Sequence, residues 1–302
     1  QGDIWSFEIP SGQNQPIDND NNNTAYLRGA MPPGVSCNNA GACLVVWDQQ
    51  ANSGEIHTLG GSFRAANGQE QPITIPASGY GSSGHRFHPV VASDGVNFLV
   101  VAELAIDNTT DETALMSMLY DANGAYTNQS GLMSAGARSS ALDQSAVSLA
   151  LVWAGTGYRL AWQSDAGAGI TIQEVGSNAA FGSGFPVAND GQSNPVLSDL
   201  SLAYEPGQKN LLLGYRDSSD QLTVQTILPN YAVANAVTLG SGLRTRLAYH
   251  PASEGWLASA TAFNGAQTFW PLNLNNQTIA NAQGGFNGNG IQSGALACPA
   301  PG

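Results

Sequence analysis

Two carboxylates stand at matching positions behind two similar apolar segments, and such a pair could hydrolyse a glycosidic bond. Asp48 follows Leu-Val-Val-Trp at 44–47, and Glu103 follows Leu-Val-Val-Ala at 99–102. Glycosidases use two carboxyl groups about 5 to 10 Å apart, one as a general acid and the other as a base or nucleophile. The matching position in three later segments holds Gln163, Arg216 and Thr261. The repeated position therefore holds an acid in only two of the five segments. We keep hydrolysis as an alternative to binding.

The segments that carry these residues belong to a unit that recurs about every fifty residues. Each unit begins with a short apolar strand and a turn with Gly or Pro, and a stronger apolar strand follows. The stronger strands are predicted at 44–48, 99–103, 159–163, 212–216 and 257–261. With two weaker strands after them, the units have the four strands in about fifty residues that are typical of a β-propeller blade. A sandwich or a solenoid is the alternative, but neither explains this period.

We therefore predict an all-β chain that forms a six-bladed β-propeller, as a single domain over residues 1–302. Five units are nearly whole, at about 30–80, 81–137, 138–192, 193–241 and 242–290. The sixth blade is expected from residues 1–20 plus 291–302, so that N- and C-terminal strands close the ring. Closure would remove exposed strand edges.

Matching sequence at the two ends of the chain supports this sixth blade. Leu-Ala-Cys at 296–298 resembles Leu-Ala-Tyr at 247–249, and Gln-Pro-Ile at 15–17 repeats at 71–73. The blade has no evident second strand, and three explanations stay open. It is three-stranded, or its N-terminal pair holds the second and third strands, or a neighbouring molecule adds a strand by β-augmentation. The last case would link subunits into a polymer.

The five polar residues that end the strong strands are expected to converge at the mouth of the propeller channel. The loops after these strands share one face of a propeller, so a ligand could contact several of them. The residues predicted to bind a ligand there are Asp48, Glu103, Gln163, Arg216 and Thr261, with Trp47, Trp162 and Tyr215 beside them. The alternative is that the polar residues are ordinary strand ends and the aromatic residues belong to the core, which is the commoner situation.

A calcium site is a further candidate. Asp18, Asp20 and Asn22 place oxygen ligands at alternate positions, as at the start of a calcium loop. The usual Gly at the sixth position and Glu at the twelfth are absent, so a polar linker is the alternative. Apart from calcium, we expect no cofactor.

The composition excludes several classes of partner. Charged residues make up 10% of the chain, and the formal net charge is −13 with nine lysines and arginines. Binding to phosphates or to an anionic membrane needs clustered cations, so we expect no nucleic-acid partner. No apolar run reaches the roughly 18 residues of a membrane span, so we expect no membrane insertion. The expected partner is a glycan or a protein ligand, with self-assembly as a further option.

Cysteines and sequons favour an oxidising compartment. A β-turn between Cys37 and Cys43 would bring their side chains close enough for a disulfide, with free thiols or a metal pair as alternatives. Cys298 has no assigned partner. Glycosylation sequons stand at Asn22, Asn108, Asn128 and Asn276. Gln1 is typical of a processed N-terminus, and we expect a secreted protein that is extracellular or lies at the cell surface.

The units resemble a repeat found in large secreted bacterial β-propeller proteins. Its pattern is His-Pro, an apolar strand, an Asp-Gly turn and an aromatic residue before Leu-Val-Val-Trp. The best match is His-Pro-Val-Val-Ala-Ser-Asp-Gly-Val-Asn-Phe-Leu-Val-Val at 88–101, and 43–48 matches the second half. Later units drift, and Ala102 and Ala260 stand in place of the tryptophan. The resemblance implies a propeller outside the cell and implies no catalytic activity.

These observations favour a non-enzymatic extracellular module for binding or assembly, in cell-surface adhesion or in interaction with proteins or glycans. Its polar surface of low charge suits such contacts. One alternative is a structural subunit of an extracellular polymer. Another is a glycoside hydrolase or lyase of the propeller fold.

Overall fold

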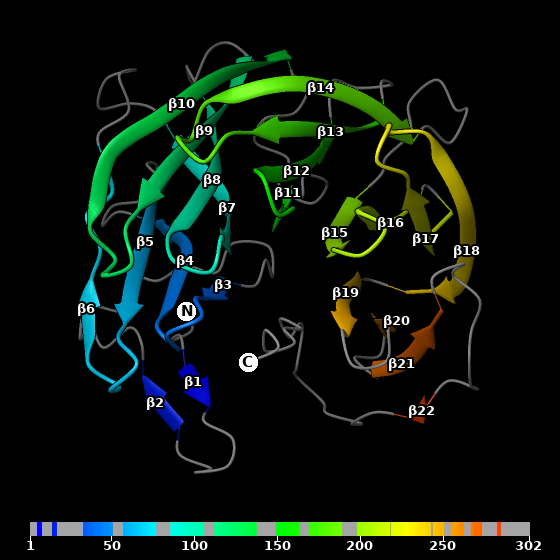
Figure 1. Cartoon of the computed structure of the whole chain (residues 1–302), viewed down its shortest axis with the longest axis horizontal. Helices are drawn as coiled ribbons and strands as arrows, with labels where there is room; N and C mark the ends of the chain where they lie inside the picture. The colour runs from blue at the N-terminus through cyan, green and yellow to red at the C-terminus, as the bar shows by residue number, and fades with distance from the viewer. Residues whose placement is uncertain are drawn as a thin grey trace. The chain divides into compact units, whose positions relative to one another are not determined.

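The chain forms an all-β propeller, and the strands of each blade follow one another in sequence (Figure 1). The computed structural model describes residues 5–7, 14–16, 33–50, 57–76, 85–105, 112–137, 149–163, 169–188, 198–217, 219–242, 244–250, 255–262, 267–273 and 283–284. These residues form five four-stranded antiparallel sheets and one two-stranded sheet. The chain divides into two compact units, Gln1–Ala141 and Leu142–Gly302. A single domain over the whole chain stays a prediction.

The first unit holds blades 1 and 2. Blade 1 consists of β3 (Gly34–Cys37), β4 (Cys43–Gln50), β5 (His57–Arg64) and β6 (Glu70–Pro72). Blade 2 consists of β7 (His85–Ser93), β8 (Phe98–Ala105), β9 (Glu112–Tyr120) and β10 (Tyr126–Ala137).

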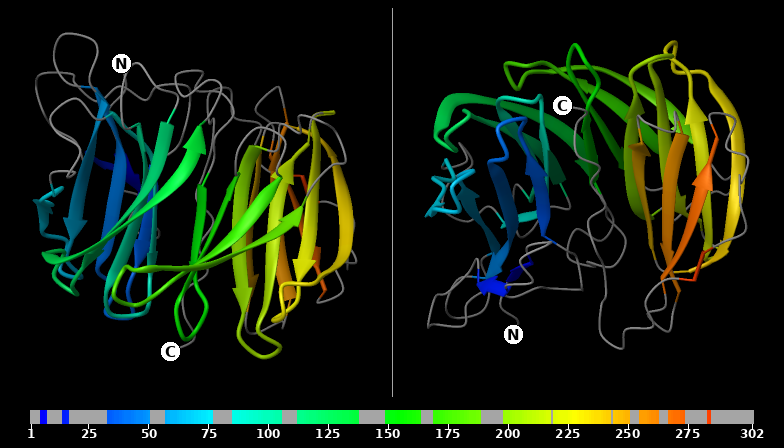
Figure 2. Two further views of the ribbon diagram at one scale, coloured as in Figure 1. Left: turned by 90° about the horizontal axis from the view of Figure 1, so that it is seen from above. Right: turned by 60° about the horizontal axis from the view of Figure 1, so that its bottom comes forward.

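The second unit holds blades 3, 4 and 5, whose strands appear in further views in Figure 2. Blade 3 consists of β11 (Leu149–Trp153), β12 (Tyr158–Gln163), β13 (Ile170–Val175) and β14 (Phe181–Ala188). Blade 4 consists of β15 (Ser198–Glu205), β16 (Asn210–Arg216), β17 (Gln221–Ile227) and β18 (Val233–Ser241). Blade 5 consists of β19 (Arg244–His250), β20 (Gly255–Thr261), β21 (Gln267–Leu272) and β22 (Gln283–Gly284).

The prediction of six blades is wrong, because the described strands make five. The N-terminal strands β1 (Trp5–Phe7) and β2 (Asn14–Pro16) pair with each other through three residue pairs. They form a two-stranded sheet of their own within the described residues. Strands this short offer few ladder hydrogen bonds, and Pro16 has no N–H to donate. The expected partner at 296–298 lies outside the described residues.

The second strand of a blade is buried on both faces, which explains its continuous apolar sequence. On β8, Phe98, Leu99, Val100 and Val101 are fully buried. In blade 4, Leu211 and Leu213 pack in a core with Ile170 and Ile172 of blade 3.

Successive residues of the same strand serve different interfaces. Leu212, between those two leucines on β16, packs in a separate core with Leu247 and Trp256 of blade 5. Alternation along one strand therefore joins a blade to both neighbours in its unit.

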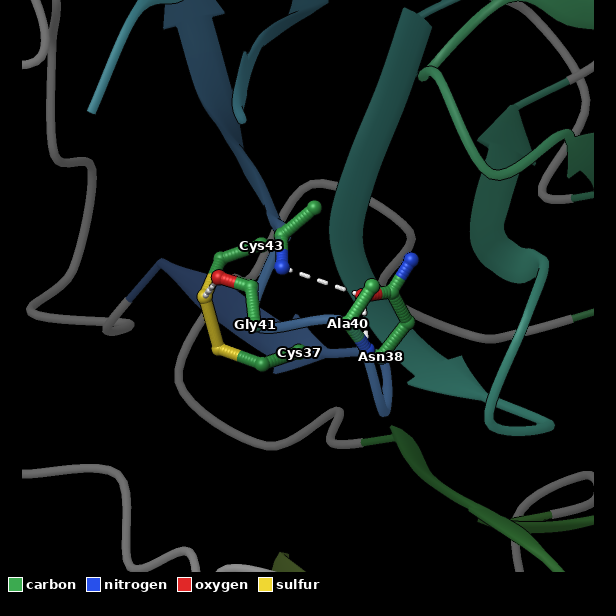
Figure 3. The surroundings of a disulfide bond; sticks show 6 residues. Cys37, Asn38, Ala40, Gly41 and Cys43 are labelled. Carbon is green, nitrogen blue, oxygen red and sulfur yellow. Dashed lines mark hydrogen bonds between the residues drawn. A yellow bond between two sulfur atoms is a disulfide. The ribbon is translucent and has the colours of Figure 1, made fainter. Parts of the chain in front are cut away.

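The predicted disulfide between Cys37 and Cys43 is confirmed (Figure 3). These residues pair across the β3–β4 ladder, with their Cα atoms 4.0 Å apart. In the turn between them, the Asn38 side-chain oxygen accepts hydrogen bonds from the backbone N–H groups of Ala40 and Ala42. The Asn38 side-chain amide donates to the Val96 carbonyl oxygen, so this turn is also held against blade 2.

A polar network joins blades 3 and 4. The Tyr231 hydroxyl donates a 2.6 Å hydrogen bond to Glu174, which also forms a 3.3 Å ion pair with Arg159. The Tyr231 ring stacks on Phe185, with ring centroids 3.8 Å apart. Burial, and then the hydrogen bond to Glu174, raise the pKa of Tyr231 to about 12.

None of the described residues forms a helix long and apolar enough to cross a bilayer.

We expect Gly124→Ala to destabilise the protein by about 2 to 4 kcal/mol, from backbone strain together with overpacking. Gly124 has a φ of +75°, and an added Cβ would lie 2.5 Å from Cγ of Phe63 in blade 1. Gly68→Ala is the matched control, because Gly68 also has a positive φ of +84° but its added Cβ would meet nothing nearer than 3.8 Å. Urea unfolding should give the control a loss of only about 1 kcal/mol. Equal losses would contradict the role of the Phe63 contact.

We expect the stability that Tyr231 contributes to disappear in alkaline solution. The folded state holds the Tyr231 proton with a pKa of about 12, against 10.0 for an ordinary tyrosine. This contribution is therefore complete below pH 10 and is lost as the pH rises through 12. Tyr231→Phe keeps the ring but has no proton to release, so its unfolding free energy should fall less steeply over this range. If the unfolding free energies of the two proteins fell in parallel with pH, the raised pKa of Tyr231 would be refuted.

Candidate functional site

The polar residues predicted at the channel mouth lie at the ends of the second strands. Gln163, Arg216 and Thr261 are the last residues of β12, β16 and β20, and Asp48 and Glu103 lie two residues before the ends of β4 and β8. The ladder pairs Glu103 with Phe87, Arg216 with Ser198, and Thr261 with Arg244. These three partners lie near the starts of first strands. Each blade thus presents its polar residue at the same end.

Burial differs among the predicted ligand-binding residues. Glu103 is 3% exposed and Thr261 6% exposed, whereas Gln163 and Arg216 are half-buried. The side chain of Asp48 lies outside the described residues. Trp47 and Trp162 are buried and Tyr215 is half-buried against the core between blades 3 and 4. Ligand binding by this set stays a prediction.

A β-bulge in the first strand of blade 2 aims a buried histidine at Glu103. The register of β7 shifts between Phe87 and Val90, and His88 within this shift has a φ of 51°. Its Nδ1 atom lies 3.3 Å from Oε2 of Glu103. His88 and Glu103 are both buried. A carboxyl group that is buried and held by an imidazole is suited to acid–base chemistry.

Blade 4 has the same backbone feature with other charges. The register of β15 shifts between Ser198 and Ser201, and Asp199 within the shift has a φ of 56°. Its Oδ2 atom lies 3.2 Å from Nε of Arg216, which stands at the strand position that Glu103 holds in blade 2. Left-handed φ values at residues other than glycine cost of order 1 to 3 kcal/mol and cluster at functional sites.

Sequence reasoning missed both bulge residues. A bulge adds one residue to a strand and breaks the alternation from which strand faces are predicted. Only the residue types gave a signal, since His and Asp adopt left-handed φ values more readily than most residues.

Asp199 also joins blade 4 to blade 5. Its Oδ1 atom lies 3.3 Å from Nε of Arg244 on β19. The backbone N–H of Leu247 donates a 3.0 Å hydrogen bond to Ser201, which keeps β15 and β19 side by side. Two arginines from neighbouring blades therefore share one carboxylate.

The remaining candidates stay predictions. The calcium ligands Asp18, Asp20 and Asn22 and the sequons at Asn108 and Asn276 lie outside the described residues, whereas Asn128 is exposed on β10. Across the described segments, no group of three His, Cys, Asp or Glu side chains could hold a metal ion.

Comparison with known proteins identifies the fold. The sequence matches no protein-family model and no curated protein. The structure is similar to an α-L-arabinofuranosidase from Fusarium graminearum, with 10% identity, a TM-score of 0.58 and 82% of each chain covered. It is also similar to a Penicillium chrysogenum α-L-arabinanase complexed with arabinobiose, with 10% identity and a TM-score of 0.57 over 88% of this chain and 81% of that one.

A third similar structure is a Hadza microbial sialidase, with 14% identity and a TM-score of 0.54. The match covers 82% of this chain, which spans 56% of the sialidase's length. At such identities the likeness shows the fold.

These neighbours correct the prediction of a non-enzymatic binding or assembly module. The three similar structures above are an arabinofuranosidase, an arabinanase and a sialidase, and none is named as a binding or assembly module. The repeated sequence pattern predicts acids only at the end of the second strand. The bulge at Asp199 shows that the first strand also brings a carboxylate to this end of a blade.

We expect His88→Gly to be more stable than His88→Ala by about 1 kcal/mol. Both variants lose the contact with Glu103, but only alanine must hold a Cβ at the positive φ of 51°. At the exposed β3 residue Val35, where the ladder with β4 has no register shift, the order should reverse and glycine should be the less stable. Urea unfolding of the four variants measures both differences. The same order at both positions would argue against the bulge.

Proposed function

We propose that this chain is a glycoside hydrolase of the β-propeller fold, with Glu103 as one of its two catalytic carboxyl groups. The observation that carries the proposal is the burial of Glu103 against His88 at the end of β8. Burying a carboxylate is costly unless it is paired, so its retention in a protein interior favours a chemical role. The fold shared with an arabinanase, an arabinofuranosidase and a sialidase supports the same activity.

Asp48 is our candidate for the second carboxyl group. It occupies in blade 1 the strand position that Glu103 occupies in blade 2, two residues before the end of the second strand. The two blades pack against each other in one core that contains Val46 of β4 and Val100 of β8. Matching positions on adjacent blades of one unit are suited to a pair that acts on opposite sides of one bond.

The proposed reaction needs only these two groups and water. One carboxyl group protonates the glycosidic oxygen as the bond to the anomeric carbon breaks. The other either activates a water molecule or forms a glycosyl-enzyme intermediate that water then hydrolyses. His88 contacts Glu103 and fixes the position of its carboxyl group, so we assign it a positioning role.

The proposal includes secretion of the enzyme. The Cys37–Cys43 disulfide is typical of proteins that mature in an oxidising compartment.

We expect Glu103→Gln to reduce hydrolysis by a factor of about 100 or more, because the amide can neither give nor take the proton. The assay measures release of reducing ends from arabinan and of 4-nitrophenol from a panel of aryl glycosides. Arabinan comes first because two of the similar structures are an α-L-arabinanase and an α-L-arabinofuranosidase.

Glu70→Gln is the matched control, since Glu70 is exposed on β6 and the substitution is the same. It should leave the rate unchanged, and thermal unfolding should show that both variants are folded. Asp48→Asn should lose activity as Glu103→Gln does. A wild-type protein that cleaves nothing in the panel, or a Glu103→Gln variant with full activity, would disprove the proposal.

A further inference from the structure

Three of the nine basic residues of this acidic chain gather at one end of blades 4 and 5. They are Arg216 at the end of β16 and Arg244 and Arg246 at the start of β19. Arg244 and Arg246 are two apart on one strand and so extend from the same face. In a chain with a net charge of −13, such a gathering of cations needs an explanation.

Asp199 and Asp220 supply carboxylates to this cluster. Asp199 contacts Nε of Arg216 at 3.2 Å and Nε of Arg244 at 3.3 Å. Asp220 contacts Nη1 of Arg216 at 3.1 Å, but its side chain is 55% exposed, and water weakens such a pair. Arg246 donates from Nη1 to the neutral carbonyl of Thr245.

The side chain of Arg244 has a donor without a partner among the described residues. It is 11% exposed, and its Nη1 atom is buried with no hydrogen-bond partner among the described residues. A buried donor of a charged group that lacks a partner costs free energy, which a bound acceptor would recover. The pKa of Arg244 is lowered, first by burial and then by Arg216, despite the opposing effect of Asp199. Burial and the nearby Arg244 lower the pKa of Arg246 to about 10.

We propose that Arg216, Arg244 and Arg246 form a binding site for the anionic group of an acidic glycan, a carboxylate or a sulfate. Guanidinium groups bind such oxyanions through paired N–H donors, and the Nη1 atom of Arg244 is a donor of this kind. Asp199 holds the Nε atoms of two arginines and so orients their guanidinium groups. The choice of a glycan as the carrier of the anion rests on the proposed function. The anion site itself rests on the arginine cluster.

Equilibrium binding tests this site separately from catalysis. The full chain with Glu103→Gln, which prevents turnover, is titrated with three probes: an oligogalacturonate, its methyl ester of the same length, and inorganic sulfate. The ester has the same sugar rings without the charges. We expect the oligogalacturonate to bind at least about tenfold more tightly than the ester, because charge-assisted hydrogen bonds are lost with the charge.

Arg244→Gln, added to the same protein, should remove this preference. Arg159→Gln is the matched control, because Arg159 pairs with Glu174 in blade 3 and lies outside the cluster. Binding of the oligogalacturonate assigns the site to a carboxylate, and binding of sulfate alone assigns it to a sulfate group. If neither anion binds, or if Arg244→Gln binds as well as its parent, the anion site is refuted.

A second variant keeps the proposal testable if Arg244→Gln does not fold. Asp220→Asn removes an exposed carboxylate that competes for Arg216. Affinity for the anion should then rise by about two- to fivefold, the range expected for one surface ion pair. An unchanged or weaker affinity counts against the site. Hydrolysis of neutral arabinan by the wild-type chain is measured in parallel, so failure of one proposal leaves the other standing.

Discussion

The alternation of side chains along the second strand of a blade holds it to the neighbouring blades of its own unit. On β16, Leu211 and Leu213 pack toward blade 3 while Leu212 packs toward blade 5. In the first unit, Val46 of β4 and Val100 of β8 share another core. Each buried aliphatic side chain contributes about 1.5 to 3 kcal/mol, so a polar residue in the middle of such a strand would be costly. The ion pairs at His88 and Asp199 accordingly lie near strand ends.

In blades 2 and 4, a bulge in the first strand brings a second charged or titratable side chain to the end of the second strand. The bulges at His88 and Asp199 occur at the same place in blades 2 and 4. Each turns a side chain toward a charged residue at or near the end of the second strand, which is Glu103 in blade 2 and Arg216 in blade 4. The same kind of β-bulge thus supports an imidazole–carboxylate pair in the first unit and an arginine cluster in the second. The repeated blade structure thus places residues at equivalent positions, and the residue types at those positions differ between blades 2 and 4.

Much of the fold could be predicted from local sequence. The strong apolar strands and the Cys37–Cys43 disulfide follow from segments of a few residues, and the structure contains them. The prediction of a sixth blade was wrong because a strand needs partners. The matching residues at 15–17 and 71–73 indicated strands, but they did not indicate which other strands would pair with them. The hairpin did form as β1 and β2, but in a sheet of its own within the described residues. The functional prediction relied on the resemblance of the repeats to non-catalytic modules. That resemblance concerns the strands of the blades and carries no information on the contacts at their ends.

The sequence by itself determined the strands of the five blades, because turn residues and apolar strands are set by a few neighbouring residues and recur about every fifty residues. It also placed Glu103 and Arg216 at one repeated position. Only the tertiary structure decided what these residues meet. Glu103 meets a histidine 15 residues away, and Arg216 shares Asp199 with an arginine of the next blade. The physical reason is that a bulge and the packing of adjacent blades set these distances, and neither leaves a periodic signal in the sequence.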